Sequence, residues 1–195
     1  MKFEIPKEIL SISQKIKEAG FEAYLVGGCV RDLILGKKPK DWDFATNAKP
    51  EDIVLLFTKT FYENEYGTVG IVNEGVSDET LKIVEITPFR TESEYSDSRR
   101  PDKVSFGATL EEDLKRRDFT INAIALDADK GHLYDPHKGQ EDIKDRIIKT
   151  VGDPRVRFGE DGLRILRAIR FNAELGFMIN EETSQAIKAR ASLLQ

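Results

Sequence analysis

The chain of 195 residues has one cysteine, Cys29, and only two histidines, His132 and His137. A single cysteine excludes an internal disulfide and fits a reducing compartment. The two histidines are too few and too poorly spaced for a zinc site. The sequence also lacks an apolar run as long as a membrane span and the apolar core of a signal peptide. We therefore expect a cytoplasmic protein without disulfides and without a membrane-spanning segment.

Positive charge is also scarce, because 30 Lys and Arg face 35 Asp and Glu, for a net charge of −5. Affinity for a nucleic-acid backbone comes mostly from Lys and Arg. The balance therefore favours a module that handles nucleotides over a complete RNA-binding protein. The basic residues are nevertheless clustered, at residues 37–40, 115–117 and 155–170. A hydrophobic content of 39% and a charged content of 33% are typical of a globular protein with a real core.

The most informative stretch runs from Leu25 to Asp43. An apolar run ends in two glycines, a helix-like segment follows, and a second predicted strand, Asp41–Ala45, opens with two carboxylates. Residues i and i+2 of a strand face the same way, so Asp41 and Asp43 should project together while Trp42 faces the opposite side. Two adjacent carboxylates repel each other, and a shared cation removes that repulsion. Mg²⁺ suits this pair, because it takes one or two carboxylates together with water and substrate phosphates.

The two glycines, Gly27 and Gly28, fit the other half of such a site. Glycine lets a phosphate approach the backbone closely, and the start of the next helix offers free N–H groups. Arg31 follows on that helix, where its guanidinium could reach a triphosphate; a salt bridge with Asp32 is the alternative. A Gly-Gly pair alone is usually a turn, and an Asp-x-Asp alone is usually a solvated strand end. Their combination in this order predicts a metal-dependent phosphoryl or nucleotidyl transfer site.

These residues resemble the signature of class II tRNA nucleotidyltransferases, the CCA-adding enzymes and bacterial poly(A) polymerases of the polymerase-beta-like superfamily. Three further segments resemble motifs of that family in the same order: Lys115–Ala123, Asp135–Asp142 and Glu160–Phe171. The resemblance implies an α+β fold. A nucleotidyltransferase head with a small mixed β-sheet flanked by helices would span residues 1–150. An all-helical neck would span residues 151–195, truncated before the body and tail domains that hold tRNA.

The resemblance implies a role for three acidic residues. Asp41, Asp43 and Glu85 would be catalytic, with Asp41 and Asp43 as ligands of two Mg²⁺ ions. The family places its third acid just before a Thr and an Arg, here Thr87 and Arg90. An ordinary solvent-facing glutamate is the alternative for Glu85. One ion would activate the 3′ hydroxyl of the primer and the other would stabilise the departing pyrophosphate, with no covalent enzyme intermediate.

The resemblance also implies a set of nucleotide-binding residues, drawn from the glycine turn and the later motifs. These residues are Gly27, Gly28, Arg31, Arg117, Asp161, Arg164, Arg167 and Arg170. Arg117 would contact phosphate or ribose, and Asp118 would orient it. The arginines of the last motif would otherwise be read as an ordinary solvated face of a helix.

The residues Phe158–Leu175 predict one continuous helix with an apolar face. That face consists of Ile165, Leu166, Ile169 and Ala173. The arginines fall on the opposite side, with Asp161 at its edge. An Asp accepts from an exocyclic amine and an Arg donates to the adjacent ring acceptor, so an Asp161–Arg164 pair would accept cytosine and adenine. Uracil and guanine present the reverse pattern and would be rejected without a nucleic-acid template.

The remaining elements follow from periodicity and turn residues. The chain predicts helices at 6–19, 29–35, 50–57, 110–116 and 181–194, strands at 23–26, 68–72 and 81–87, and only helices after Gly152. The last two strands should form a hairpin. Residues Thr91–Pro101 predict a mobile loop.

The motifs together imply addition of C, A or both from CTP and ATP to the 3′ end of tRNA. Poly(A) synthesis and a non-catalytic nucleotide- or RNA-binding module are the alternatives. The expected partners are nucleoside triphosphates and the tRNA 3′ end. The main tRNA-binding surface would lie outside this chain, and no membrane or DNA partner is expected. The segment Glu65–Val69 resembles CCA- or A-adding enzymes, and the loop at 94–101 has the length that terminal A addition requires.

Overall fold

A seven-stranded sheet forms the centre of the protein in a computed structural model that describes residues 3–63, 66–93 and 103–194. The strands, in their order across the sheet, are β3 (Thr60–Tyr62), β4 (Val69–Val72), β5 (Ile83–Pro88), β2 (Asp43–Thr46), β1 (Tyr24–Val26), β8 (Ala125–Asp127) and β9 (His132–Tyr134). The neighbours pair in antiparallel fashion except β2 and β5, which are parallel. The α+β fold with a mixed sheet and flanking helices is therefore confirmed.

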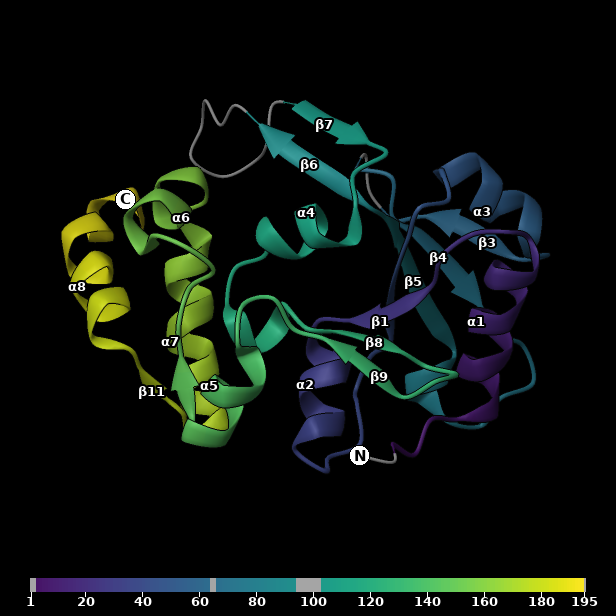
Figure 1. Ribbon diagram of the computed structural model, residues 1–195, viewed down its shortest axis with the longest axis horizontal. Coiled ribbons are helices and arrows are strands. Elements are labelled where there is room, and N and C mark those ends of the chain that lie inside the picture. The colour runs from purple at the N-terminus through teal and green to yellow at the C-terminus, as the bar shows by residue number, and fades with distance from the viewer. Residues whose placement is uncertain (1–2, 64–65, 94–102, 195) are drawn as a thin grey trace.

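The helices lie beside this sheet and to one side of it (Figure 1). Their bounds are α1 (Lys7–Glu18), α2 (Gly28–Ile34), α3 (Pro50–Leu56), α4 (Leu110–Lys115), α5 (Gly139–Asp145), α6 (Pro154–Glu160), α7 (Leu163–Leu175) and α8 (Glu181–Arg190). Short 3-10 turns occupy Glu79–Leu81, Thr120–Asn122 and Ala191–Leu194. In Figure 1, α1 and α3 lie with the sheet on the right, and α6, α7 and α8 lie on the left. Among the described residues, no helix is both long and apolar enough to cross a membrane.

The strand that carries the two carboxylates begins later than the sequence predicts. β2 begins at Asp43, so Asp41 lies just before the strand. Trp42 is nevertheless buried, and its carbonyl accepts a hydrogen bond from the N–H of Glu85 at 3.0 Å. The parallel register then places Asp43 opposite Glu85. Pairing with β5 thus brings an acid from a distant segment beside the Asp-x-Asp pair.

The hairpin of β4 and β5 is confirmed by their antiparallel register. The loop predicted at Thr91–Pro101 is wrong at its start, because β6 (Arg90–Ser93) pairs with β7 (Lys103–Phe106). β6 reads Arg-Thr-Glu-Ser, so it lacks the apolar alternation that marks a half-buried strand. Residues 94–101, and Glu65 in the earlier motif, lie outside the described residues.

The continuous helix predicted for Phe158–Leu175 is wrong. α6 ends at Glu160, Asp161 adopts an extended backbone (φ −142°, ψ 106°), and α7 begins at Leu163. The carboxylate of Asp161 accepts from the N–H of Leu163 at 2.8 Å, and such local bonds compete with helical ones. The expectation of only helices after Gly152 is also wrong, because β11 (Met178–Ile179) pairs in parallel with β10 (Ile147–Ile148).

The apolar face predicted for α7 is correct only at Ile165. Its buried side chains are Arg164, Ile165, Ala168 and Phe171, whereas Leu166 and Ile169 are 49% and 48% exposed. Periodicity shows which residues share a face but not which face meets a neighbour. Here the rest of the fold packs against the face that carries Arg164.

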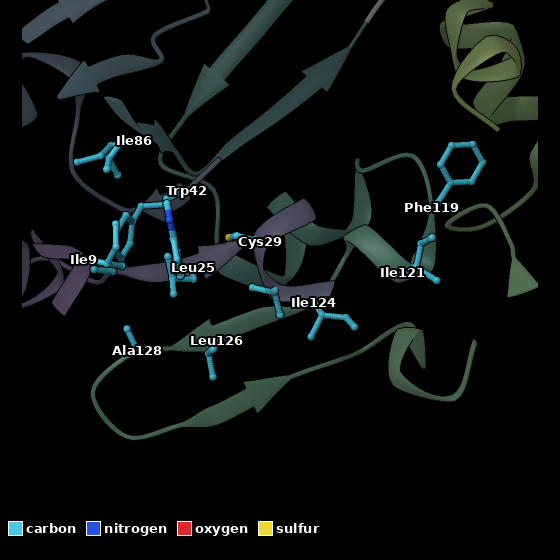
Figure 2. Close-up of a cluster of buried hydrophobic side chains, with 14 of the residues drawn as sticks. Ile9, Leu25, Cys29, Trp42, Ile86, Phe119, Ile121, Ile124, Leu126 and Ala128 are labelled. Carbon is cyan, nitrogen blue, oxygen red and sulfur yellow. The ribbon is translucent and has the colours of Figure 1, made fainter. Parts of the chain in front are cut away.

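One hydrophobic cluster runs from the sheet into the C-terminal helices. Figure 2 shows its sheet part, where Trp42 lies among Ile9, Leu25 and Ile86, and its far side, where Phe119 faces the helices. The ring of Phe119 meets the ring of Phe171 edge to face, with centroids 5.8 Å apart. Because residues on both sides of Thr150 share this cluster, the division into a head (1–150) and a neck (151–195) stays a prediction.

Candidate active site

A cleft of about 460 Å³ between α2 and α7 contains many of the predicted site residues. Six of them line it: Gly28, Arg31, Asp41, Asp43, Arg167 and Arg170. The same lining includes residues that were not predicted as site residues: Asp32, Lys37, Lys38, Lys40, Asn122, Phe171, Glu174 and Leu175. Gly27, Glu85, Arg117, Asp161 and Arg164 are not part of this lining. The structure thus brings residues from the first motif (25–43) and the last motif (160–171) together in one cleft.

The glycine turn lies directly against the carboxylates. A Cβ atom added at Gly27 would be 3.5 Å from Asp43 Oδ2 and 3.6 Å from Arg117 Nη1. A Cβ atom added at Gly28 would be 3.7 Å from Asp41 Oδ1 and 3.5 Å from Arg31 Nη2. Gly27 also has a φ of +76°, a conformation that side chains rarely adopt. The bare backbone of this turn is therefore exposed to the two acids and to two guanidinium groups.

The carboxylates of the site repel one another. Burial, Asp41 and Glu85 raise the pKa of Asp43 to about 7, against an opposing effect of Arg117. Burial, with Glu63 and Asp41, also raises the pKa of Glu85. A bound cation would offset this repulsion, because an opposite charge nearby favours the ionised form.

A metal ion at this place would need ligands from outside the chain. Among the described residues, no three His, Cys, Asp or Glu side chains are grouped closely enough to hold a metal ion. Asp41 and Asp43 nevertheless fit Mg²⁺, because this ion takes one or two carboxylates and completes its coordination with water and substrate phosphates. Zinc, which prefers His and Cys ligands, does not fit this donor set.

Arg31 is held in the cleft by two partners. Its guanidinium binds Asp32 Oδ1 at 2.8 Å and Asn122 Oδ1 at 2.8 Å. The salt bridge with Asp32 thus exists while Arg31 still lines the cleft. Sequence analysis missed Asn122, which is 91 positions away and reaches the site only through tertiary folding.

Arg117 is oriented by Asp113, so the prediction that Asp118 orients it is wrong. Asp113 is fully buried and accepts from Arg116 at 2.7 Å and from Arg117 at 2.9 Å. Burial opposes ionisation of Asp113, but Arg117 and Arg116 prevail and lower its pKa. The spacing of four residues on a helix is the signal that could have found the Asp113–Arg117 pair. Asp118 instead binds Arg167 Nε at 2.7 Å.

The two residues predicted to select the base lie close together but are not directly hydrogen-bonded. The Nε atom of Arg164 lies 4.0 Å from Asp161 Oδ2. Arg164 is buried, and it donates to Glu160 Oε2 at 3.1 Å and to the carbonyl of Arg116 at 3.3 Å. Burial raises the pKa of Asp161 against the opposing effects of Leu163, Arg164 and Arg167.

The chain is similar to known proteins along nearly its whole length. Residues 23–149 match the family model for the poly(A) polymerase head domain. The chain is 53% identical over 189 residues to a CCA-adding enzyme of Geobacillus sp. (strain WCH70), covering 96% of this chain and 45% of that protein. It is 51% identical to a CCA-adding enzyme of Ligilactobacillus salivarius (strain UCC118), covering 97% and 45%. The chain thus spans less than half the length of these curated relatives.

Solved structures show the same relationship. The fold is similar to the crystal structure of the Bacillus stearothermophilus CCA-adding enzyme in complex with CTP. The TM-score is 0.85 and the identity is 48%, over 96% of this chain and 44% of that one. It is also similar to a tRNA nucleotidyltransferase complexed with a primer tRNA and an incoming ATP analog. There the TM-score is 0.71 and the identity is 33%, over 93% and 50% of the two chains.

Proposed function

Because the chain belongs to the poly(A) polymerase head-domain family, we propose that it is the catalytic part of a tRNA nucleotidyltransferase. It adds C, A or both from CTP and ATP to the 3′ end of tRNA and releases pyrophosphate. The observation that carries this proposal is the placement of Asp41 and Asp43 against the Gly27–Gly28 turn. Similarity to CCA-adding enzymes over nearly the whole chain supports the choice of tRNA as the acceptor.

The acidic residues form the part of the site where nucleotide transfer takes place. Asp41 and Asp43 would hold Mg²⁺, which, when bound, helps to deprotonate the attacking 3′ hydroxyl and neutralises charge on the phosphates. Glu85, in register with Asp43, is the third acid of the site. These carboxylates take part without forming a covalent bond to the nucleotide.

The glycine turn and the arginines bind the triphosphate. The backbone of Gly27 and Gly28 allows close approach of phosphate oxygens, which the N–H groups at the start of α2 would bind. Arg31 and Arg117 lie beside the same turn, each already oriented by a carboxylate. Guanidinium groups fixed in this way lose little side-chain entropy when they bind a phosphate.

Base selection belongs to Asp161 and Arg164. Asp161 accepts a hydrogen bond from the exocyclic amine of cytosine or adenine, and Arg164 donates to the adjacent ring nitrogen. Glu160 and the carbonyl of Arg116 each engage one terminal nitrogen of Arg164, which leaves other N–H groups for the base. This pattern matches the substrates CTP and ATP and opposes UTP and GTP.

The acceptor and the product length can be tested in one assay. The chain is incubated with Mg²⁺ and tRNAs that end in the discriminator base, in C or in CC, with CTP and ATP supplied separately. We expect products one or two nucleotides longer, and none with UTP or GTP. The variants Asp41→Ala and Asp43→Ala should abolish extension while Glu4→Gln, an exposed site before α1, should not.

Two results would contradict the proposal. Long adenylate tails would show a poly(A) polymerase, the activity for which the matching family model is named. Absence of extension, together with equal binding of all four triphosphates, would show a module without this activity. The cytoplasmic location stays a prediction.

A further inference from the structure

Three guanidinium groups surround one aromatic ring in the cleft. The Cζ atoms of Arg31, Arg167 and Arg170 lie 5.4, 5.4 and 5.2 Å from the centroid of the Phe171 ring. Each distance is within the range of a cation–π interaction. Arg31 comes from α2 and the other two come from α7, so the ring lies where the two walls of the cleft meet.

The ring itself is held firmly. Phe171 is only 5% exposed and belongs to the main hydrophobic cluster. Its edge-to-face partner, Phe119, is fully buried, with the ring planes at 89°. A fixed ring defines the positions of the cations around it, because each attraction depends on the location of the ring.

The charges around the ring are only partly compensated. Arg31 is paired with Asp32, and Arg167 is paired with Asp118. In the part of the chain that the structure describes, Arg170 makes no ion pair. Like charges this close raise one another's free energy, and a polyanion in the cleft would lower it.

Arg31 connects this cluster to the glycine turn. Its guanidinium, held at the ring, also lies 3.5 Å from the position of a Cβ atom at Gly28. The lining of the same cleft also contains three lysines and four acids: Lys37, Lys38, Lys40, Asp32, Asp41, Asp43 and Glu174. Arg31 thus lies between the glycine turn and the other arginines around the ring, on the path of a phosphate chain that would extend from the turn toward them.

We propose that Phe171 is a positioning residue, whose ring holds Arg31, Arg167 and Arg170 together to receive the β- and γ-phosphates of the bound nucleotide. This inference rests on the proposed function and goes beyond it, because it concerns a residue that touches no substrate. Phe171 acts through the three guanidinium groups, which bind the triphosphate and then the pyrophosphate that leaves. Loss of the ring should thus weaken both ligands alike.

The test compares leucine substitutions at two buried phenylalanines. Phe171→Leu keeps most of the apolar volume but removes the aromatic ring, whereas Phe171→Tyr retains an aromatic ring. The matched control is Phe177→Leu, because Phe177 is 2% exposed and carries one guanidinium, Arg146 at 5.9 Å, outside the cleft. Affinities for CTP and for inorganic pyrophosphate, both with Mg²⁺, are measured by calorimetry, and thermal unfolding is measured in parallel.

We expect Phe171→Leu to weaken both ligands about tenfold, since several cation–π contacts are lost together. Phe171→Tyr should remain within about twofold of the parent chain, and Phe177→Leu should bind normally at a similar loss of thermal stability. In the extension assay, KM for CTP should rise while kcat changes little, as for a contact made equally in the ground and transition states. If the leucine variant does not fold, Phe171→Met serves in its place.

Equal losses of affinity in the two leucine variants, or none in either, would overturn the inference and leave Phe171 as a packing residue. Failure of the tyrosine variant to restore affinity would do the same. The proposed function can fail separately: a parent chain that binds pyrophosphate through Phe171 but never extends tRNA would refute the transfer activity alone.

Discussion

The side chain of Arg167 donates from Nε to Asp118 Oδ2 at 2.7 Å and so joins α7 to the segment that follows α4. The other oxygen of Asp118 accepts from the backbone N–H of Phe119 at 2.8 Å, and the ring of Phe119 packs on Phe171 of α7. A charged contact and an aromatic contact therefore meet at the same junction. This junction holds the wall formed by α7 in place opposite the Gly27–Gly28 turn.

Replacing Asp43 should stabilise the metal-free protein at neutral pH. The pKa of Asp43 is raised from 3.8 to about 7, so its ionisation opposes folding as pH rises from about 4 to about 7. Asp43→Asn removes this effect and should increase the free energy of unfolding at pH 8 by at most about 4 kcal/mol, with little change at pH 4. Urea unfolding with EDTA at both pH values measures the difference. A variant less stable than the parent at pH 8 would contradict the electrostatic picture, and Glu4→Gln is the control.

Replacing Asp161 should alter base choice more than affinity. Asp161→Ala removes the acceptor for the exocyclic amine, so discrimination against UTP and GTP should fall by about 1.5–3 kcal/mol. The phosphate contacts come from other residues and should persist. Asp153→Ala is the control, because Asp153 caps the neighbouring helix α6 through the N–H of Arg155 at 2.7 Å. Unchanged selectivity among the four triphosphates would show that this residue does not contact the base.

Replacing Asp113 should destabilise the fold. Asp113→Asn leaves Arg116 and Arg117 without their buried carboxylate, which should cost about 3 kcal/mol of unfolding free energy at pH 7. The pKa of Asp113 is lowered in the folded state, so its contribution is present above its ordinary pKa and disappears as pH falls through the folded value. The difference between variant and parent should therefore shrink in acid. Glu111→Gln, at an exposed site on the same helix, should change little; an equal effect would contradict the special role of Asp113.

Two glycines in helices should respond in opposite ways to alanine. A Cβ atom at Gly139 would lie 2.2 Å from the carbonyl oxygen of Thr120, so Gly139→Ala should destabilise the fold by about 3 kcal/mol. A Cβ atom at Gly159 meets nothing within 4 Å, so Gly159→Ala should stabilise α6 by about 0.5–1 kcal/mol. Thermal unfolding of both variants measures the contrast. Equal shifts would mean that the backbone at Thr120 yields easily.

The chain should bind nucleotides more firmly than tRNA. The proposed triphosphate contacts lie in the cleft and at the adjoining Gly27–Gly28 turn, whereas binding of an RNA backbone requires many basic contacts. With a net charge of −5, the chain should lose tRNA as salt rises from low to moderate concentration while CTP remains bound with Mg²⁺. Separate titrations with tRNA and CTP measure this. Tight tRNA binding that persists at moderate salt would place the main RNA-binding surface within these residues.

Local patterns alone determined a large part of this protein. The glycine turn, the helix that follows it and the hairpin of β4 and β5 depend on neighbours in sequence, so turn chemistry and periodicity predicted them. The family followed from motifs in a fixed order, and the family model confirms it. The roles of the site residues stay predictions, although six of them share one cleft.

Only the tertiary structure decided how the motifs combine. Periodicity placed Leu166 and Ile169 in the core, but the fold buries Arg164 instead, because its charge is met by Glu160 and by the carbonyl of Arg116, just after α4. Asn122 and the Phe171 ring meet Arg31 through contacts between distant segments, whereas Arg167 and Arg170 approach that ring from its own helix. A sequence pattern reports which residues share a face. The partner of that face is set by long-range packing and charge pairing, which no local pattern contains.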